Sequence, residues 1–420
     1  MSDGAIDLKA EARAKAYALP LDQIDVARAS LFQRDIHWPY FERLRREDPV
    51  HYCQESLHGP YWSITKYNDI MAVDMNHQVF SSDATVGGIG IAGVPNSEGP
   101  SMFISMDPPK HDAQRKVVSP VVSPQNLHTM APMIRDRTAR VLDGLPIGEP
   151  FDWVDRVSIE LTTQMLATLF DFPFEERRNL TKWSDIFTGA GHLHGIETPE
   201  DRMAEMERFR ETFERLWAER VGAEPAGDLI SMLAHGDATR QMSRREYHGN
   251  VVLLIVGGND TTRNTMTGSV YALNQFPDQF AKLKANPDLL PSMVCETIRW
   301  QTPLAHMRRT AIDDFEFQGK PIRKGDKVVM WYVSGNRDEE VIENPNAYII
   351  DRERPRQHLS FGFGIHRCVG NRLAELQLNI LWQEILKRFG DIQVVEEPRR
   401  TSSTFVKGYE AMTVVIPARL

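Results

Sequence analysis

Residues 359–370 read Leu-Ser-Phe-Gly-Phe-Gly-Ile-His-Arg-Cys-Val-Gly, and we take this stretch as decisive for the fold. Two glycines punctuate a loop that ends at Cys368, and the apolar residues beyond it are spaced as on one helix face. Unpaired backbone N–H groups and the positive dipole end at a helix start favour a thiolate, the form that binds iron. The glycines admit a flat ligand between the apolar walls of Phe361 and Phe363. The loop therefore predicts a ligating cysteine, whereas a lone cysteine is usually structural.

The loop resembles the haem-thiolate signature of the cytochromes P450, Phe-Gly-x-Gly-x-His-x-Cys-x-Gly, at every fixed position. This resemblance implies a haem b cofactor with Cys368 as the axial ligand of its iron. It further implies that His366 contacts a haem propionate and that Phe361 and Gly370 belong to the cofactor site.

A second informative segment, residues 251–265, is apolar before Gly257 and polar after it. Each of its two adjacent glycines costs about 1 kcal/mol against alanine in a helix, so an ordinary core helix would seldom keep both. Gly257 and Thr261 are four residues apart and share a face, and a threonine hydroxyl can bond the carbonyl one turn earlier. A kinked helix with a capping Asp-Thr pair is the alternative interpretation.

This segment is similar to the Gly-Gly-x-Asp-Thr-Thr motif in the long central helix of the cytochromes P450. The similarity implies that Asp260 and Thr261 are the catalytic acid–alcohol pair. In that role Thr261 would hydrogen-bond dioxygen at the haem, and Asp260 would relay protons so that the O–O bond breaks productively.

Glu296 and Arg299 are three residues apart, a helical spacing that brings opposite charges together. Taken alone, such a pair is a common surface ion pair of little value. Its position before the cysteine loop matches the Glu-x-x-Arg motif of the family, which implies a buried structural pair. Either Arg352 or Arg354 would be the third member, and the sequence leaves both open.

Two further matches to the family supply cations for the haem propionates. His111 and Arg115 are spaced to face one way on a helix opened by proline, although a solvated face would have the same spacing. Arg309 stands where the family places a propionate arginine, before the first strand of the late sheet.

The substrate is predicted from residues 254–264 and 298–311, which look closely similar to bacterial alkane terminal hydroxylases of this superfamily. That likeness implies oxidation of medium-chain alkanes, fatty acids or cyclic terpenes. The side chains expected over the iron are apolar or small, which suits a hydrocarbon. We predict that the substrate pocket is formed by Val86, Ile89, Ile91, Val94, Leu253, Val256, Gly257, Gly258, Leu304 and Ala305.

Other functions share part of this pattern. A steroid or branched-lipid terminal hydroxylase of the same superfamily would carry every motif and differ only in the pocket. A haem sensor without turnover, or a peroxygenase, needs no controlled proton delivery to dioxygen, so the intact pair at 260–261 disfavours both.

The chain as a whole predicts a mainly α fold with minor β. Helical periodicity dominates from about 110 to 300, a helix is expected at 39–47, and strands are expected near 50–53, 61–65, 310–334 and 411–418. The family resemblance implies a triangular helical domain with a small β-rich region around haem b. We expect an N-terminal arm over 1–25, one haem domain over 26–420, and a long glycine-rich loop at 83–105 that is mobile or functional.

Composition sets limits on partners and compartment. The 420 residues carry a net charge of −9, which argues against nucleic acid, and the three cysteines do not suggest a disulfide framework. We see no apolar run that could span a membrane and no signal peptide, so we expect a soluble cytoplasmic protein. The chain has no flavin or cluster motif, so electrons should come from an iron–sulfur ferredoxin and its NAD(P)H reductase. Arg367 and Arg372 would lie on the docking face.

Overall fold

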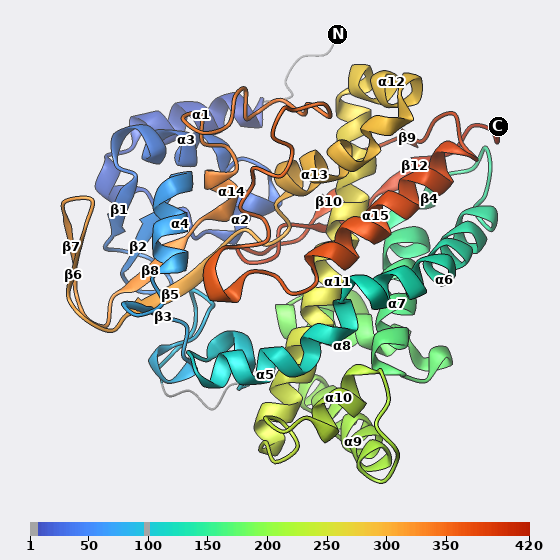
Figure 1. The fold of residues 1–420 in the computed structure, drawn as a ribbon. Coiled ribbons are helices and arrows are strands. Elements are labelled where there is room, and N and C mark those ends of the chain that lie inside the picture. The colour runs from blue at the N-terminus through green and yellow to red at the C-terminus, as the bar shows by residue number, and fades with distance from the viewer. Residues whose placement is uncertain (1–6, 96–100) are drawn as a thin grey trace.

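The computed structural model describes residues 7–95 and 101–420 of the chain. Helices make up most of it and short strands gather in small sheets, which confirms the predicted mainly α fold with minor β (Figure 1). Residues 1–6 of the predicted arm and 96–100 of the predicted loop lie outside the described residues.

The helices of the first half are α1 (Leu8–Ala18), α2 (Ala29–Gln33), α3 (Trp38–Glu47), α4 (Tyr67–Met75), α5 (Lys110–Val118), α6 (Pro124–Asp143), α7 (Glu160–Phe170), α8 (Arg178–Thr188) and α9 (Pro199–Val221). Those of the second half are α10 (Leu229–His235), α11 (Arg244–Gln275), α12 (Pro277–Ala285), α13 (Leu290–Gln301), α14 (Tyr332–Gly335) and α15 (Asn371–Leu386). The helix predicted at 39–47 is α3, and the region from 110 to 300 is dominated by helices.

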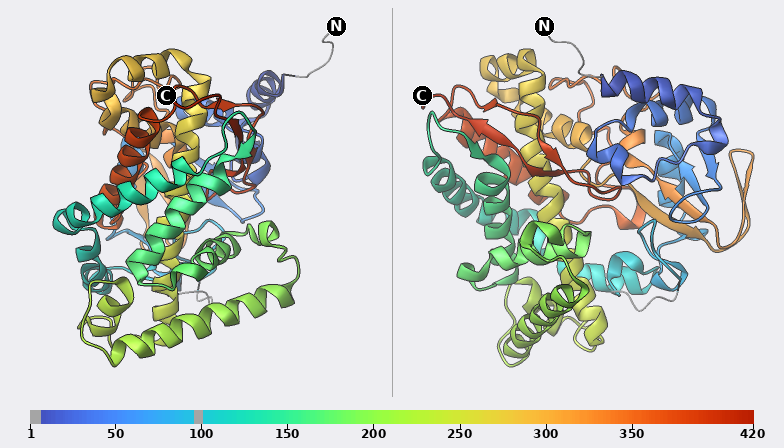
Figure 2. Two further views of the ribbon diagram at one scale, coloured as in Figure 1. Left: turned by 90° about the vertical axis from the view of Figure 1, so that its right-hand side faces the viewer. Right: turned by 180° about the vertical axis from the view of Figure 1, so that it is seen from behind.

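Helix α11 is the axis of the fold and crosses the whole molecule in Figures 1 and 2. A capping box starts it: the Ser243 side chain accepts from the Glu246 backbone N–H, and the Glu246 side chain accepts from the backbone N–H of Ser243. The helix runs for 32 residues without a break at Gly257. The kinked helix that was the alternative interpretation of residues 251–265 therefore does not end there. Helices α7, α8, α13 and α15 pack along it.

The largest sheet has the strand order β1-β2-β8-β5-β3 and lies beside α1, α3 and α4 on one side of the molecule (Figure 1). Only its β2–β8 pair is parallel among the pairs of this sheet that the structure describes. Its strands are β1 (Val50–Cys53), β2 (Tyr61–Ile64), β3 (Phe80–Ser81), β5 (Met307–Ala311) and β8 (Lys327–Met330). The other strands are β4 (Phe151–Asp152), β6 (Phe315–Phe317), β7 (Lys320–Ile322), β9 (Gln393–Val394), β10 (Arg399–Arg400), β11 (Tyr409–Ala411) and β12 (Thr413–Val415).

The described part of the predicted N-terminal arm is packed on the body. Ala12 and Ala16 of α1 are buried in one cluster with Tyr40 and Phe41 of α3. Burial of these side chains ties α1 to the sheet side of the molecule. The division at residue 25 therefore stays a prediction about domains, and α1 itself is part of the packed structure.

Helix α15 fixes the segment that follows the cysteine loop. Leu381 and Trp382 lie in the same buried cluster as Met266 and Val270 of α11. The Trp382 indole also donates a hydrogen bond to Ser269 Oγ at 2.8 Å. Helix α15, which follows the predicted iron ligand, and α11, which carries the predicted acid–alcohol pair, thus share one core.

Candidate active site

The cysteine loop is shaped by its two glycines. Gly362 and Gly364 have φ angles of 66° and 63°, in the left-handed region that favours glycine. A Cβ on Gly364 would lie 2.5 Å from the backbone oxygen of Asp74, so a larger residue cannot fit there. The Cys368 N–H then donates to the Phe361 carbonyl at 2.8 Å, which closes the loop just before α15 begins at Asn371.

A cavity of about 600 Å³ lies between this loop and α11. Cys368 is exposed, and it lines this cavity together with Phe361, Gly370 and Thr261. Cys53 and Cys295 are buried, and burial raises the pKa of each thiol to about 11. Cys368 is thus the cysteine that is presented to a ligand.

The thiol of Cys368 does not follow the sequence-based expectation for its acidity. Although Cys368 is open to the cavity, the protein packed around the loop desolvates its thiol and raises its pKa. The N–H groups of Gly370 and Asn371 and the guanidinium of Arg115 act in the opposite direction. The N–H groups at the helix start thus lower the pKa as the sequence indicated, but desolvation is the larger effect, so the pKa of the free thiol is raised. Coordination to a metal ion deprotonates such a thiol outright.

Polar groups suited to the propionates of a haem meet at His366. Both of its ring nitrogens are buried and have no hydrogen-bond partner within residues 7–95 and 101–420. The His111 ring lies 4.3 Å away, centroid to centroid, and its Nε2 is likewise without a partner there. Burial, Arg309, His111 and Arg115 lower the pKa of His366 to about 2, so its imidazole is neutral. These orphaned donors beside two cavity-lining arginines fit an anionic cofactor edge.

Asp260 is fully buried at the cavity wall and held by three donors. Ser184 Oγ donates to its Oδ2 at 3.2 Å, while Asn259 Nδ2 and Arg263 Nη2 donate to its Oδ1, each at 2.9 Å. Burial raises the pKa of Asp260 to about 6, and Arg263 acts against that rise. The carboxyl can therefore take up and release a proton near neutral pH.

Arg263 joins Asp260 to a second buried carboxylate. Its Nη2 lies 2.9 Å from Asp185 Oδ1 on α8, and Asp185 Oδ2 lies 2.7 Å from His194 Nε2. His194 follows α8 in a short 3₁₀ turn, Gly191–His194, and its side chain is 27% exposed. A continuous polar chain thus leads from the cavity wall toward solvent. The sequence analysis missed it: Arg263 stands one turn after Asp260, but nothing local points to Asp185.

Thr261 occupies the same wall, one residue along α11. Its Oγ1 donates to the Gly257 carbonyl at 2.7 Å, the backbonding that the spacing indicated. A Cβ on Gly257 would meet nothing within 4 Å, whereas one on Gly258 would lie 2.8 Å from Leu166 Cδ2. Gly257 therefore keeps the cavity open, and Gly258 lets α7 approach α11.

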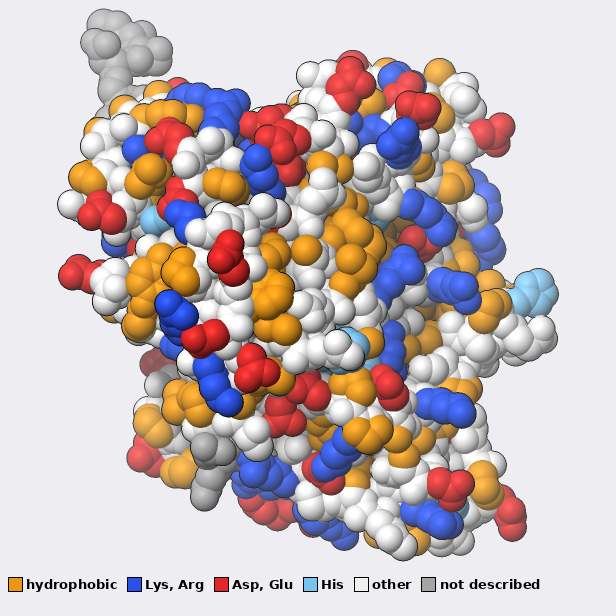
Figure 3. Space-filling view, turned by 60° about the vertical axis from the view of Figure 1, so that its left-hand side comes forward, with side chains coloured by type: hydrophobic (Ala, Val, Ile, Leu, Met, Phe, Trp, Pro, Cys, Tyr) orange, Lys and Arg blue, Asp and Glu red, His pale blue; other side chains and the backbone are white. Residues whose placement is uncertain are grey.

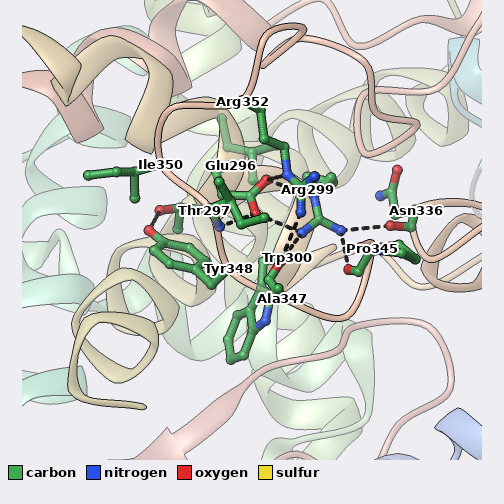
Figure 4. A network of polar contacts seen from close by, with 12 residues as sticks. Glu296, Thr297, Arg299, Trp300, Asn336, Pro345, Ala347, Tyr348, Ile350 and Arg352 are labelled. Atoms are coloured by element: carbon green, nitrogen blue, oxygen red, sulfur yellow. Dashed lines mark hydrogen bonds and ion pairs between the residues drawn. The ribbon is translucent and has the colours of Figure 1, made fainter. Parts of the chain in front are cut away.

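The ion pair at 296–299 is buried, and Figure 4 shows the polar contacts around it. Arg299 donates from Nε and Nη2 to the two Glu296 oxygens at 2.7 and 2.8 Å, and from Nη1 to the carbonyls of Asn336 and Pro345. Arg352 Nε also donates to Glu296 Oε2, at 2.9 Å, whereas Arg354 is exposed. The third member that the sequence left open is thus Arg352.

Six of the ten residues predicted for the substrate pocket line the cavity: Ile89, Leu253, Val256, Gly257, Gly258 and Leu304. The other four do not. Ile91 and Ala305 are buried in the cluster beside α2 and α3, and Val94 is 62% exposed. The Val86 carbonyl accepts hydrogen bonds from the side chains of Arg308 and Thr310, and Val86 does not line the cavity.

Arg308 explains why the glycine-rich loop departs from the prediction. Its guanidinium donates to the carbonyls of Val86, Gly87 and Gly93. Its backbone N–H donates to the Ile89 carbonyl at 2.8 Å. Burial lowers the pKa of the Arg308 guanidinium to about 10. Its hydrogen bonds go to carbonyl oxygens, which do not offset burial as a carboxylate would. These hydrogen bonds from Arg308 hold the loop in a conformation in which Ile89 lines the cavity.

Comparison with known proteins gives the family. A family profile described as Cytochrome P450 matches residues 125–408. The chain belongs to the cytochrome P450 family. Haem b is the cofactor of that family, and it supplies the chemistry of dioxygen activation when bound; Cys368 would hold its iron. The orphaned histidines and the two arginines around the cavity fit its propionates.

Among similar P450 proteins, CYP153D17 from Sphingomonas sp. PAMC 26605 is 48% identical with a TM-score of 0.86, covering 94% of this chain and 100% of that one. Cytochrome P450-153 from Novosphingobium aromaticivorans is 46% identical with a TM-score of 0.86, covering 93% and 98%. Linalool 8-monooxygenase of Pseudomonas putida is 34% identical, covering 94% of this chain and 99% of the relative. These likenesses confirm a P450 monooxygenase with the family fold.

The P450 cavity also has lining residues that sequence reasoning missed. They include residues from the end of the glycine-rich loop, from α7 and α8, and from a bridge in which Leu304 pairs with Val406. Some of them, such as Leu254, Ile298 and the apolar run at 102–104, stood inside segments that the sequence had singled out. The additional residues include Met102, Phe103, Ile104, Leu166, Leu169, Phe187, Thr188, Phe405 and Val406. No helix within the described residues is both long and apolar enough to cross a membrane.

Proposed function

We propose that this P450 hydroxylates the terminal carbon of a neutral medium-chain substrate, an alkane or a small terpene. The charge of the cavity wall carries the proposal. Within the described residues, the arginines that line the cavity are Arg115 and Arg309, and both belong to the expected propionate side. The carboxylate of the described wall, Asp260, is already paired with Arg263.

A carboxylate head group would therefore find no free cation beside the acid–alcohol pair. Burying an ionised carboxylate without a partner costs several kcal/mol or more, whereas each buried methylene contributes about 0.8 kcal/mol. Fatty acids, which the sequence also allowed, are for this reason weaker candidates than hydrocarbons of the same length.

Terminal oxidation requires that the wall admits a chain end and excludes a bend. Gly257 leaves space on α11, and Leu253, Val256 and Leu304 stand around the same cavity. The likeness of residues 254–264 and 298–311 to alkane terminal hydroxylases supports this regiochemistry. The similarity to a linalool 8-monooxygenase supports terpenes as the second neutral class.

In this proposal Cys368 holds the iron, and His111, Arg115, Arg309 and His366 hold the propionates. Thr261 orients a proton at its Oγ1, and Asp260 takes up and releases a proton. Arg263 stays protonated and holds the carboxylates of Asp260 and Asp185 in place.

Electrons come from a ferredoxin and its NAD(P)H reductase, as expected from the sequence, and the enzyme works in the cytoplasm. Figure 3 shows a band of Lys and Arg side chains on the right of the face, besides others scattered over it among Asp and Glu, and such a band supports docking of an acidic carrier. Arg367, directly before Cys368, is exposed.

Spectral titration of the haem protein tests the charge argument. Three ligands of equal chain length are compared: the n-alkane, the primary alcohol and the fatty acid at a pH where it is ionised. We expect the neutral two to bind at least about tenfold more tightly than the carboxylate. Equal or tighter binding of the carboxylate contradicts the proposal, and tight binding of sterols alone favours the steroid hydroxylase.

A further inference from the structure

Asp74, in the last turn of α4, is a buried acid that the function above does not use. Its side chain is 1% exposed, and three groups donate to its carboxylate. Arg309 Nη2 donates to Oδ1 at 2.6 Å, while the Tyr332 hydroxyl and the Phe363 backbone N–H donate to Oδ2 at 2.9 and 2.8 Å. Every one of these partners belongs to the wall or the loop of the haem site.

The end of α4 is also the surface on which the cysteine loop rests. A Cβ on Gly364 would strike the Asp74 carbonyl oxygen, and one on Gly362 would lie 3.5 Å from Asp74 Oδ2. Phe363, between these glycines, is the residue whose N–H the carboxylate receives. Asp74 thus contacts three successive residues of the loop that ends at Cys368.

The charges of Asp74 and Arg309 have unequal access to the cavity. Arg309 lines the cavity, and Asp74 lies behind it, away from the lining. Burial and the neighbouring Asp74 raise the pKa of Tyr332, so its hydroxyl stays neutral and adds no charge. The arginine is therefore presented to the cofactor as half of a neutral pair.

We propose that Asp74 is a positioning residue of the haem site, which anchors the cysteine loop and cancels the charge that Arg309 brings to a propionate. The consequence is electrostatic. With the pair intact, little net positive charge acts on the iron from this side, and its reduction potential stays low.

The test measures the ferric/ferrous midpoint potential of the substrate-free haem protein, together with the spectrum of its reduced CO complex. Asp74→Asn removes the charge and keeps the shape, so the midpoint potential should shift upward. Tyr332→Phe is the matched control, because it removes one donor and leaves the carboxylate charge in place, and its potential should shift much less than that of Asp74→Asn. An unchanged potential in Asp74→Asn overturns the proposal.

The double variant Asp74→Asn/Arg309→Gln keeps the proposal testable if the single variant loses haem. It removes both charges and leaves no buried ion unpaired, so its potential should stay close to the wild-type value. A clear fall in the double variant would mean that Arg309 acts on the haem as a full charge, and would overturn the neutral pair. Retention of the thiolate-type CO spectrum shows in each case that Cys368 remains the ligand.

Discussion

Arg263 Nη2 lies 2.9 Å from Asp260 Oδ1, three residues earlier on α11, and both side chains are buried. The same guanidinium nitrogen lies 2.9 Å from Asp185. One cation thus stands between two carboxylates. The proton that neutralises the excess charge can reside on Asp260, whose pKa burial raises from 3.8 to about 6.

Opposite pH shifts are expected from the two neighbours of Asp260. Arg263→Gln removes a cation that lowers the pKa of Asp260, so the pH profile of product formed per NAD(P)H should move to higher pH. Asp185→Asn removes a carboxylate that raises this pKa, so the profile should move to lower pH. Shifts of the same sign in the two variants would contradict the arrangement.

Stability should respond to pH through the same group. The folded-state pKa of Asp260 is raised, so its protonated form stabilises the fold fully below pH 3.8, and this contribution is lost as the pH rises through about 6. Asp260→Asn cannot ionise and should lose less stability than the wild type between pH 5 and 7, as checked by thermal unfolding at a series of pH values. Parallel pH curves for the two proteins would refute this.

Thr261→Ala should uncouple electron use from product formation. The variant keeps the cavity wall but loses the hydroxyl that orients a proton, so hydrogen peroxide should rise and product per NAD(P)H should fall about tenfold or more. Substrate binding should be nearly unchanged. Thr261→Ser, which keeps a hydroxyl, is the matched control, and equal coupling in wild type and Thr261→Ala would rule out this role.

Glu296→Gln should weaken the fold by about 3–5 kcal/mol, because Arg299 would keep its buried charge without a carboxylate. Arg352→Gln should cost less, since its side chain is 10% exposed and Arg299 remains paired. Arg354→Gln, at an exposed position, should change stability by no more than about 0.5 kcal/mol. Unfolding followed at the haem Soret band ranks the three, and a larger effect at Arg354 than at Arg352 would contradict the structure.

Features that depend on residues close together in the sequence could be predicted, and features that depend on distant residues could not. The cysteine loop and the 257–261 segment were predicted because their residues act within one turn or one loop. Arg352 and Arg354 could not be told apart, since only the folded chain brings Arg352 to Glu296.

The substrate wall was predicted less well for a related reason. Leu304 and Ala305 are both apolar, but the bridge to Val406 places Leu304 at the cavity, while the Ala305 N–H bonds to the Phe405 carbonyl and its side chain packs away from the cavity. Likewise Val94 and Ile91 are apolar loop residues whose direction depends on Arg308, some 215 positions later along the chain. Such distant pairings leave no pattern in one sequence.

The most direct measurement is the product distribution from a homologous series of n-alkanes, analysed by gas chromatography after turnover with ferredoxin and reductase. The account predicts mainly the primary alcohol in the wild type. It also predicts a larger share of subterminal alcohols in Leu304→Ala, which widens the cavity wall, and an unchanged distribution in Val94→Ala, whose side chain lies outside it. Mainly subterminal alcohols from the wild-type enzyme, or no oxidation of any linear chain, would contradict the account.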